Sequence, residues 1–301
     1  MVEIYGLIYG LIGSLCFAAW PIFYKKGSKK LSTLFTNFVR LILPAFLILF
    51  YITVIDYWQM ILSIKPRILF FIVCASILNM IIADSLYFKA IKYINVARAI
   101  TISSAYPLFV IIFTGEKFTG KVVLGIALIL AGIYIVSSAR TKNGSGNSLE
   151  KEAALGKFDN KCILGIISGL MAAVIWGGGI TLIKISVSEV SPVIVNFFTL
   201  MSSLLIIFSI NLFTGKLKAI KTITKYQFIN LSAAGAISMF FGSLFLYKGL
   251  EICEAGIITS IAATSPIMAA IFSFIFLKEK MTRYLITGIF LSIIGVIIVV
   301  A

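Results

Sequence analysis

Residues 116–136, EKFTGKVVLGIALILAGIYIV, recur near the end of the chain as residues 279–299, EKMTRYLITGIFLSIIGVIIV. Both copies end in a long apolar run, and a helix rising 1.5 Å per residue needs roughly 20 such residues to cross the hydrocarbon core of a bilayer. The stretch therefore predicts a membrane-spanning helix that occurs twice. Each copy also carries two glycines seven residues apart, which puts small residues on one helix face and predicts close helix packing. These glycines are Gly125 and Gly132 in the first copy, and Gly288 and Gly295 in the second.

Apolar blocks of the same length run along the whole chain of 301 residues. Hydrophobic residues make up 60% of the sequence and charged residues only 12%, whereas soluble domains carry about 25% charged residues. Strands of a membrane barrel would alternate apolar and polar positions, and that pattern is missing. We therefore predict an all-α membrane protein of ten transmembrane helices, approximately at residues 5–24, 34–54, 68–90, 96–114, 122–139, 162–184, 193–213, 228–250, 255–277 and 284–301.

A polar stretch at residues 140–161 separates two halves of five spans each, and its Gly and Ser residues are typical of a flexible linker. We interpret residues 1–139 and 162–301 as two copies of one five-helix repeat. Because five is odd, the second copy enters the membrane from the opposite side, so the two repeats are inverted. Inverted repeats are a recurring transporter architecture.

Further landmarks of the two halves recur in the same order: Gly13 and Trp20 with Gly169 and Trp176, Ser32 and Asn37 with Ser191 and Asn196, FKAIK at 88–92 with YKGLE at 247–251, and Pro107 with Pro266.

The net charge of +15 comes from Lys and Arg in short loops between apolar blocks, which fits contact with anionic lipid headgroups and argues against nucleic acid. The four cysteines lie far apart and histidine is absent, so no metal site, disulfide framework or cofactor is predicted. No phosphate-binding loop of an ATPase occurs. The chain begins without a basic leader, and we expect its first helix to be retained. The sequence leaves the oligomeric state open.

The chain resembles the EamA type of the drug/metabolite transporter superfamily across essentially its whole length. The resemblance rests on GSLCFAAW at 13–20 and GLMAAVIW at 169–176, on Arg40 in the second span, and on the acidic turns TGEKFT and LKEKMT. It implies a ten-helix transporter whose central cavity is lined by spans 1–4 and 6–9. One departure is the distance from proline to acidic turn, which is four residues longer in the second half, about one helical turn. We therefore expect the fourth span to be shorter than the ninth, or distorted.

Two ionisable residues lie deep inside apolar blocks, where charges usually face a cavity or a partner. Arg40 lies in the second span and Asp84 in the third. Arg40 is a candidate anchor for a substrate carboxylate or phosphate, and Asp84 a candidate partner for an amine, a cation or a coupled proton. Equally, the two residues can pair with each other, or snorkel to an interface, and hold the bundle together.

Two tryptophans stand at matching places beside helix-weakening residues, Trp20 before Pro21 and Trp176 before Gly177, Gly178 and Gly179. Weakened helices at corresponding positions indicate a site or gate in transporters, although interfacial tryptophans explain the pattern as well. Spans 4 and 9 are the most polar, and their hydroxyl groups can line a cavity or hold helices together. The remaining candidates for the cavity are Asn37, Asn79, Thr101, Ser104, Tyr106, Asn196, Thr259, Ser260 and Thr264, and those for the hinges are Pro107 and Pro266.

These features predict a secondary transporter or exporter of small polar metabolites, such as amino acids or related compounds, working by alternating access in the cell membrane. An intramembrane lipid-modifying enzyme is the alternative, but a chain without histidine is poorly equipped for acid–base work, and we predict no catalytic residue. A non-transporting membrane scaffold is the third possibility. The resemblance implies cytoplasmic termini, whereas the distribution of Lys and Arg favours termini outside, so the orientation stays open.

Overall fold

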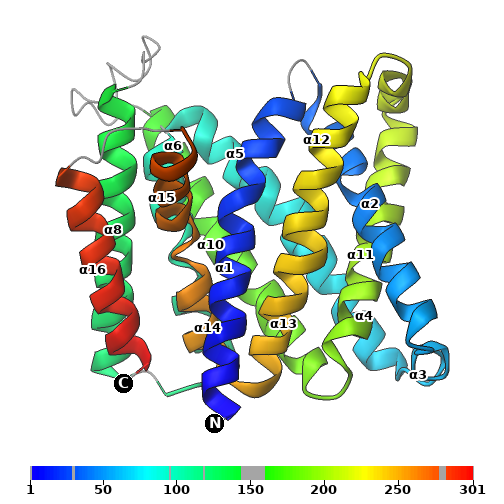
Figure 1. Cartoon of the computed structure of the whole chain (residues 1–301), viewed down its shortest axis with the longest axis horizontal. Coiled ribbons are helices and arrows are strands. Elements are labelled where there is room, and N and C mark those ends of the chain that lie inside the picture. The colour runs from blue at the N-terminus through cyan, green and yellow to red at the C-terminus, as the bar shows by residue number, and fades with distance from the viewer. Residues whose placement is uncertain are drawn as a thin grey trace. The chain divides into compact units, whose positions relative to one another are not determined.

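A computed structural model describes residues 2–28, 31–94, 96–117, 119–143, 160–277 and 283–300, and every regular element among them is helical (Figure 1). The all-α prediction is confirmed for these residues. Six of the described helices are long and apolar enough to cross a membrane: Ile4–Tyr24, Leu34–Val54, Pro66–Ala90, Lys161–Val187, Pro192–Phe213 and Lys225–Ile252. Four shorter apolar helices stand at the other predicted spans: Ala99–Thr114, Gly120–Ile135, Ala255–Ala269 and Ile286–Val299.

The first half consists of α1 (Val2–Gly27), α2 (Thr33–Val54), α3 (Trp58–Leu62), α4 (Pro66–Ser76), the π-helix η1 (Ile77–Ala83), α5 (Asp84–Tyr93), α6 (Val96–Ser103), α7 (Tyr106–Thr114) and α8 (Gly120–Asn143). The second half consists of α10 (Asn160–Val187), α11 (Pro192–Phe213), the 3-10 helix η2 (Lys216–Lys221), α12 (Lys225–Gly235), the π-helix η3 (Ala236–Gly242), α13 (Ser243–Ile252), α14 (Ala255–Ala262), α15 (Ser265–Leu277) and α16 (Arg283–Val300). Most of the predicted linker, and Glu279 in the second acidic turn, lie outside the described residues.

Local sequence sets several of the helix ends. The side chain of Ser32 accepts a hydrogen bond from the backbone N–H of Phe35 at the start of α2, and Thr224 and Gln227 form a capping box at the start of α12. Gly115 ends α7 with a φ of 70°, a left-handed conformation that favours glycine. These caps satisfy backbone groups that the helices leave without intrahelical partners.

Four of the spans are irregular, and the irregularities match between the halves. The third and eighth spans each contain a seven-residue π-helix, η1 and η3, whose first residues are Ile77 and Ala236. The fourth and ninth spans, predicted as continuous helices, are each broken, between α6 and α7 and between α14 and α15. Both breaks directly precede the proline-containing helix, because proline has no N–H to donate to the previous turn. As the sequence spacing predicts, α7 is shorter than α15, with nine residues against thirteen.

The helices form two compact units that do not follow the two halves of the sequence. Unit 1 comprises Met1–Ile77 and Leu182–Cys253. In it α1 packs against α12, η3 and α13, and α2 packs against α11 and α12. A cluster of Phe35, Val39 and Leu231 is fully buried or nearly so between α2 and α12.

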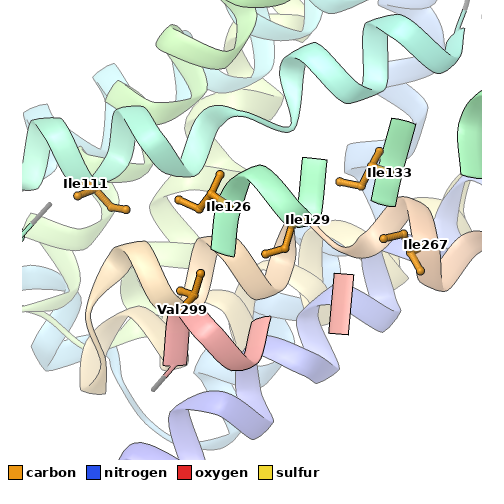
Figure 2. Close-up of a cluster of buried hydrophobic side chains, with 6 residues drawn as sticks. All are labelled: Ile111, Ile126, Ile129, Ile133, Ile267 and Val299. Carbon is orange, nitrogen blue, oxygen red and sulfur yellow. The ribbon is translucent and has the colours of Figure 1, made fainter. Parts of the chain in front are cut away.

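Unit 2 comprises Leu78–Thr181 and Glu254–Ala301. Its core is a cluster of branched aliphatic side chains from α7, α8, α15 and α16, which Figure 2 shows meeting between the helices: Ile111, Ile126, Ile129, Ile133, Ile267 and Val299. The helices α8 and α16 run side by side (Figure 1). These two helices are the repeated stretches with which the sequence analysis began.

The glycines of the repeated stretches form the contact between α8 and α16. A Cβ at Gly132 would fall against the carbonyl of Gly288 and the hydroxyl of Ser292, and one at Gly295 against the carbonyl of Gly125. The expected close packing is therefore observed. It depends on the absence of side chains at these positions.

A methyl group on this contact should destabilise the protein. We expect Gly132→Ala to lower the free energy of unfolding by about 1–3 kcal/mol, because overpacking forces the two backbones apart. Gly120→Ala is the matched control, since nothing lies within 4 Å of a Cβ there. Thermal unfolding in detergent measures both variants. Equal melting temperatures for the two would contradict the packing described.

Candidate functional site

Arg40 stands beside two aromatic rings of α1 in unit 1. Its guanidinium carbon lies 4.3 Å from the centre of the Trp20 ring and 5.7 Å from the centre of the Tyr24 ring. The two rings meet edge to face with their centres 5.3 Å apart. Arg40 is only 7% exposed, so these cation–π contacts stabilise a charge that is largely removed from water. We call Arg40, Trp20 and Tyr24 the Arg40 cluster.

Two amides predicted for the cavity are buried in the same unit. Asn37 lies one turn before Arg40 on α2, and its Oδ1 is buried with no hydrogen-bond partner among the described residues. Asn196 of α11 is completely buried and donates from Nδ2 to the carbonyl of Phe240, 3.3 Å away in η3. Asn196 therefore ties α11 to the π-helical turn of the eighth span.

Trp176 of α10 gathers a second aromatic group in unit 2. Its ring centre lies 5.4 Å from that of Tyr87 on α5 and 6.4 Å from that of Tyr106 at the start of α7. Asp84 stands one turn before Tyr87 on α5. All four side chains are half-buried. We call Trp176, Tyr87, Tyr106 and Asp84 the Trp176 cluster.

The polar residues of spans 4 and 9 are mostly bonded within their own helices. Thr259 is fully buried and donates to the carbonyl of Ala255, Ser260 donates to Gly256, and Thr264 donates to Ile261. Tyr106 links the two spans, since its hydroxyl donates to the carbonyl of Thr259 over 3.2 Å. The cavity role of these hydroxyl groups stays a prediction.

The other predicted residues are spread over several elements. Asn79 lies in η1 with its amide against Gly179 of α10, and its buried Oδ1 finds no partner among the residues described. Thr101 is half-buried on α6, while Ser104 and Pro107 are buried at the break after α6.

Neither Pro21 nor the glycines at 177–179 interrupt their helices, because α1 and α10 run continuously through them. Gly177 instead packs against Phe109 of α7, and Gly178 lies near Phe113. Pro266 is the second residue of α15.

Glu116, the acidic residue of the turn TGEKFT, joins two of the spans. Its Oε1 accepts a hydrogen bond from the backbone N–H of Ala255 (2.6 Å) and its Oε2 one from Gly256 (2.8 Å). The carboxylate, which follows α7, thus caps the first turn of α14, where negative charge also complements the helix dipole. It joins the fourth and ninth spans, the two that are broken.

Lys184 of α10 bonds to the C-terminal end of the eighth span. It was not among the predicted site residues. Its Nζ donates to the carbonyls of Leu250 (2.5 Å) and Cys253 (2.8 Å), at the C-terminal end of α13. A cation is stabilising there because the last carbonyls of a helix are otherwise unpaired and carry partial negative charge. The sequence signal was weak, since a lysine near a span end is usually interfacial.

Sequence analysis also missed one tyrosine of each cluster, Tyr24 and Tyr87, although it did name Tyr106. Tyr24 follows Trp20 by four residues and Tyr87 follows Asp84 by three, and each spacing puts the pair on one helix face. That spacing is a usable signal. However, tyrosines are common at membrane interfaces. The spacing therefore identifies a cluster only when the residue that packs against the tyrosine is known.

The broken and π-helical spans, with polar and aromatic clusters beside them, define a multi-pass membrane protein of the transporter class. The chain belongs to the EamA-like transporter family, whose model matches residues 4–138 and again residues 163–301. It is therefore a membrane transporter that meets the lipid bilayer and handles a small-molecule substrate.

Individual relatives agree with this family. An uncharacterized transporter of Archaeoglobus fulgidus is 24% identical over 296 residues, which is 97% of this chain and 96% of that protein. An uncharacterized protein of Methanocaldococcus jannaschii is 33% identical over 137 residues, which is 44% of this chain but 93% of that protein. A protein of known crystal structure, 14% identical, shares the fold with a TM-score of 0.74 over 97% of this chain and 95% of that one.

Neutralising Glu116 should loosen the cap on α14. We expect Glu116→Gln to lower the free energy of unfolding by about 1–3 kcal/mol, because an amide cannot accept from both buried N–H groups. Glu189→Gln is the matched control: its ion pairs to Lys65 (3.0 Å) and Arg67 (3.9 Å) are exposed, and such pairs contribute about 0–1 kcal/mol. Thermal unfolding in detergent compares the variants, and a larger loss for Glu189→Gln would contradict the role of the cap.

Proposed function

We propose that the protein is a secondary transporter that moves small polar metabolites, amino acids or related compounds, by alternating access. The ten predicted spans then form two inverted repeats of five, and the repeats rock or bend around a site near the middle of the membrane. The function rests on the helix irregularities, since a rigid bundle of regular helices offers no place to bend.

The observation that carries the proposal is the register of these irregularities. The two π-helices begin at Ile77 and Ala236, and the helices after the two breaks begin at Tyr106 and Ser265. Both pairs are 159 residues apart. π-helical turns are frequent at functional sites, and broken helices at corresponding places of two repeats point to the binding site or gate.

A second observation supports the duplication behind the repeats. The family model matches the chain twice, and the Methanocaldococcus relative aligns over most of its own length with less than half of this chain. A five-span unit is thus a natural building block. Joined to a copy of itself by a short linker, it inserts in the opposite sense.

For substrate binding, the Arg40 cluster is the best anion anchor. A guanidinium presents a planar fork of donors that matches a carboxylate or phosphate, and the Trp20 and Tyr24 rings hold it in one orientation. A nearly buried arginine interacts strongly with an added anion because little water screens the pair. Asn37, one turn away, adds an amide.

Transport itself is tested in liposomes that contain the purified protein, with counterflow of radiolabelled amino acids as the readout. Saturable flux supports the transporter and argues against both an intramembrane enzyme and a scaffold. Folded, reconstituted protein without saturable flux of any amino acid contradicts the proposed substrate class.

Closing either helix break should slow turnover. Alanine at 107 or 266 restores an N–H that can bond to the previous turn, so each pair of short helices can fuse into one rigid span. We expect Pro107→Ala and Pro266→Ala each to reduce the counterflow rate at least about fivefold, because conformational steps often limit turnover. Pro66→Ala is the control, since Pro66 opens α4 after a loop. Wild-type rates in both variants would contradict a role for the breaks.

Removing the Arg40 charge should raise the KM for substrates that bear a carboxylate. We expect an increase of about tenfold or more for Arg40→Gln, and a smaller one for Arg40→Lys, which keeps the charge but loses the fork. Arg67→Gln is the matched control, because Arg67 also lies near an aromatic ring, Phe71 at 5.4 Å, but has a 70% exposed side chain. An equal KM for the Gln variants at 40 and 67 would contradict the anchor.

A further inference from the structure

Five lysines gather at one end of the helices of unit 1. One stands near the C-terminal end of α1, three belong to η2 and one opens α12: Lys26, Lys216, Lys218, Lys221 and Lys225. We call these five residues the lysine surface. Lys216 is half-buried and the other four are exposed.

Packing brings the three elements to the same place. The buried cluster between α2 and α12 also takes up Tyr24 of α1 and Ala219 of η2. A Cβ at Gly27 would fall against Leu231 of that cluster, so the end of α1 adjoins α12 (Figure 1). The lysine surface is therefore a feature of the fold as well as a run of basic residues in the sequence.

The acidic residues of unit 1 lie away from the lysine surface. Residues 4–55 and 190–250, which supply most of the unit, contain neither aspartate nor glutamate. The four acidic residues that the unit does contain stand at the opposite ends of the same spans: Glu3 in the first turn of α1, Asp56 after α2, Glu189 before α11 and Glu251 near the end of α13. The positive charge of the surface is thus not balanced within its own unit.

Ion pairing differs between the two ends of the unit for this reason. Lys65 and Arg67 at the other end are both paired with Glu189. Within the part of the chain that the structure describes, none of the five lysines forms an ion pair. Such a group of like charges attracts an anion from outside the protein.

Exposed apolar side chains border the lysines. Phe213, the last residue of α11, is 88% exposed, and Ile220 in η2 and Tyr226 in α12 are exposed as well. Because α11 and α12 belong to membrane spans, η2 connects them at the level where a span meets the lipid headgroups. At that level lysine stems lie along apolar surface and their ammonium groups reach the headgroups.

We propose that the lysine surface binds an anionic phospholipid, with the phosphate against the ammonium groups and the acyl chains along Phe213 and Ile220. Charge complementarity selects this partner, since groups of four to eight basic residues beside a span attract anionic headgroups. The apolar border selects a lipid over a soluble phosphate compound. The inference goes beyond the proposed transport function and does not depend on it.

Fluorescence anisotropy of a tail-labelled phosphatidylglycerol, added to the purified protein in dodecyl maltoside, tests the surface. Phosphatidylcholine with the same chains and label is the control, because its headgroup has no net charge. We expect phosphatidylglycerol to bind at least about tenfold more tightly, and less so in high salt, which screens exposed charges. Equal affinity for the two lipids would overturn the proposal.

Competition with glycerol 3-phosphate distinguishes a lipid from a soluble phosphate compound. Without acyl chains this compound cannot contact Phe213 and Ile220, so an equal concentration should leave the labelled phosphatidylglycerol bound. Its displacement under these conditions would mean that the surface takes a soluble anion, and the lipid would be the wrong partner.

Paired variants locate the binding. Lys218→Gln combined with Lys221→Gln should weaken phosphatidylglycerol at least about tenfold, because each lysine near an anionic surface contributes about fivefold in affinity. Lys65→Gln combined with Arg67→Gln is the matched control: it removes the same charge from side chains that are 76% and 70% exposed, at the other end of the unit, and should leave the affinity unchanged.

Arginine at both positions, Lys218→Arg with Lys221→Arg, keeps the charge and should retain binding, which separates a loss of charge from a loss of folding. Unchanged affinity in the glutamine pair at 218 and 221, or equal weakening by the pair at 65 and 67, would refute the lysine surface as the binding site.

Discussion

The hydrocarbon core of the bilayer offers no hydrogen bonds, so every backbone N–H and C=O in it must be satisfied by the protein. Regular helices meet this constraint by themselves, and most of the described chain is helical for that reason. At several of the places where the helices are irregular or end, a side chain supplies a partner. Asn196 donates to Phe240 in η3, Glu116 accepts from the first N–H groups of α14, and Lys184 donates to the last carbonyls of α13. These polar side chains lower the free-energy cost of placing a bent or broken helix in a membrane.

The two halves share their backbone irregularities but not their charges. Arg40 corresponds to Thr199 and Asp84 to Ser243, at the same separation of 159 residues that relates the π-helices. Each tryptophan therefore has different neighbours, Trp20 an arginine and Trp176 two tyrosines. The two halves thus share the positions of their helix irregularities, while a few differing residues give them two chemically distinct clusters.

Hydropathy placed the spans well because a long apolar run has few alternatives to a membrane helix. The prolines at 107 and 266 were recognised as points of weakness because a missing N–H acts locally. The π-helices escaped notice, since a register shift of one hydrogen bond leaves no mark on ILNMIIA or AISMFFG. Pro21 and the glycines at 177–179 have propensities that disfavour a helix, yet α1 and α10 continue through them, and their role as hinges stays a prediction. Packing of a long span outweighs a local preference of about 1–3 kcal/mol.

The sequence by itself determined the helical class, the approximate spans, the repeated stretches and the close packing at their glycines, because these depend on composition and on short periodic patterns. Only the tertiary structure decided which residues act together. Tyr87 and Tyr106 meet Trp176 from helices far apart in the chain, and Glu116 caps a helix that begins at Ala255. Such contacts follow from how helices pack and cross, and no local pattern of residues encodes them.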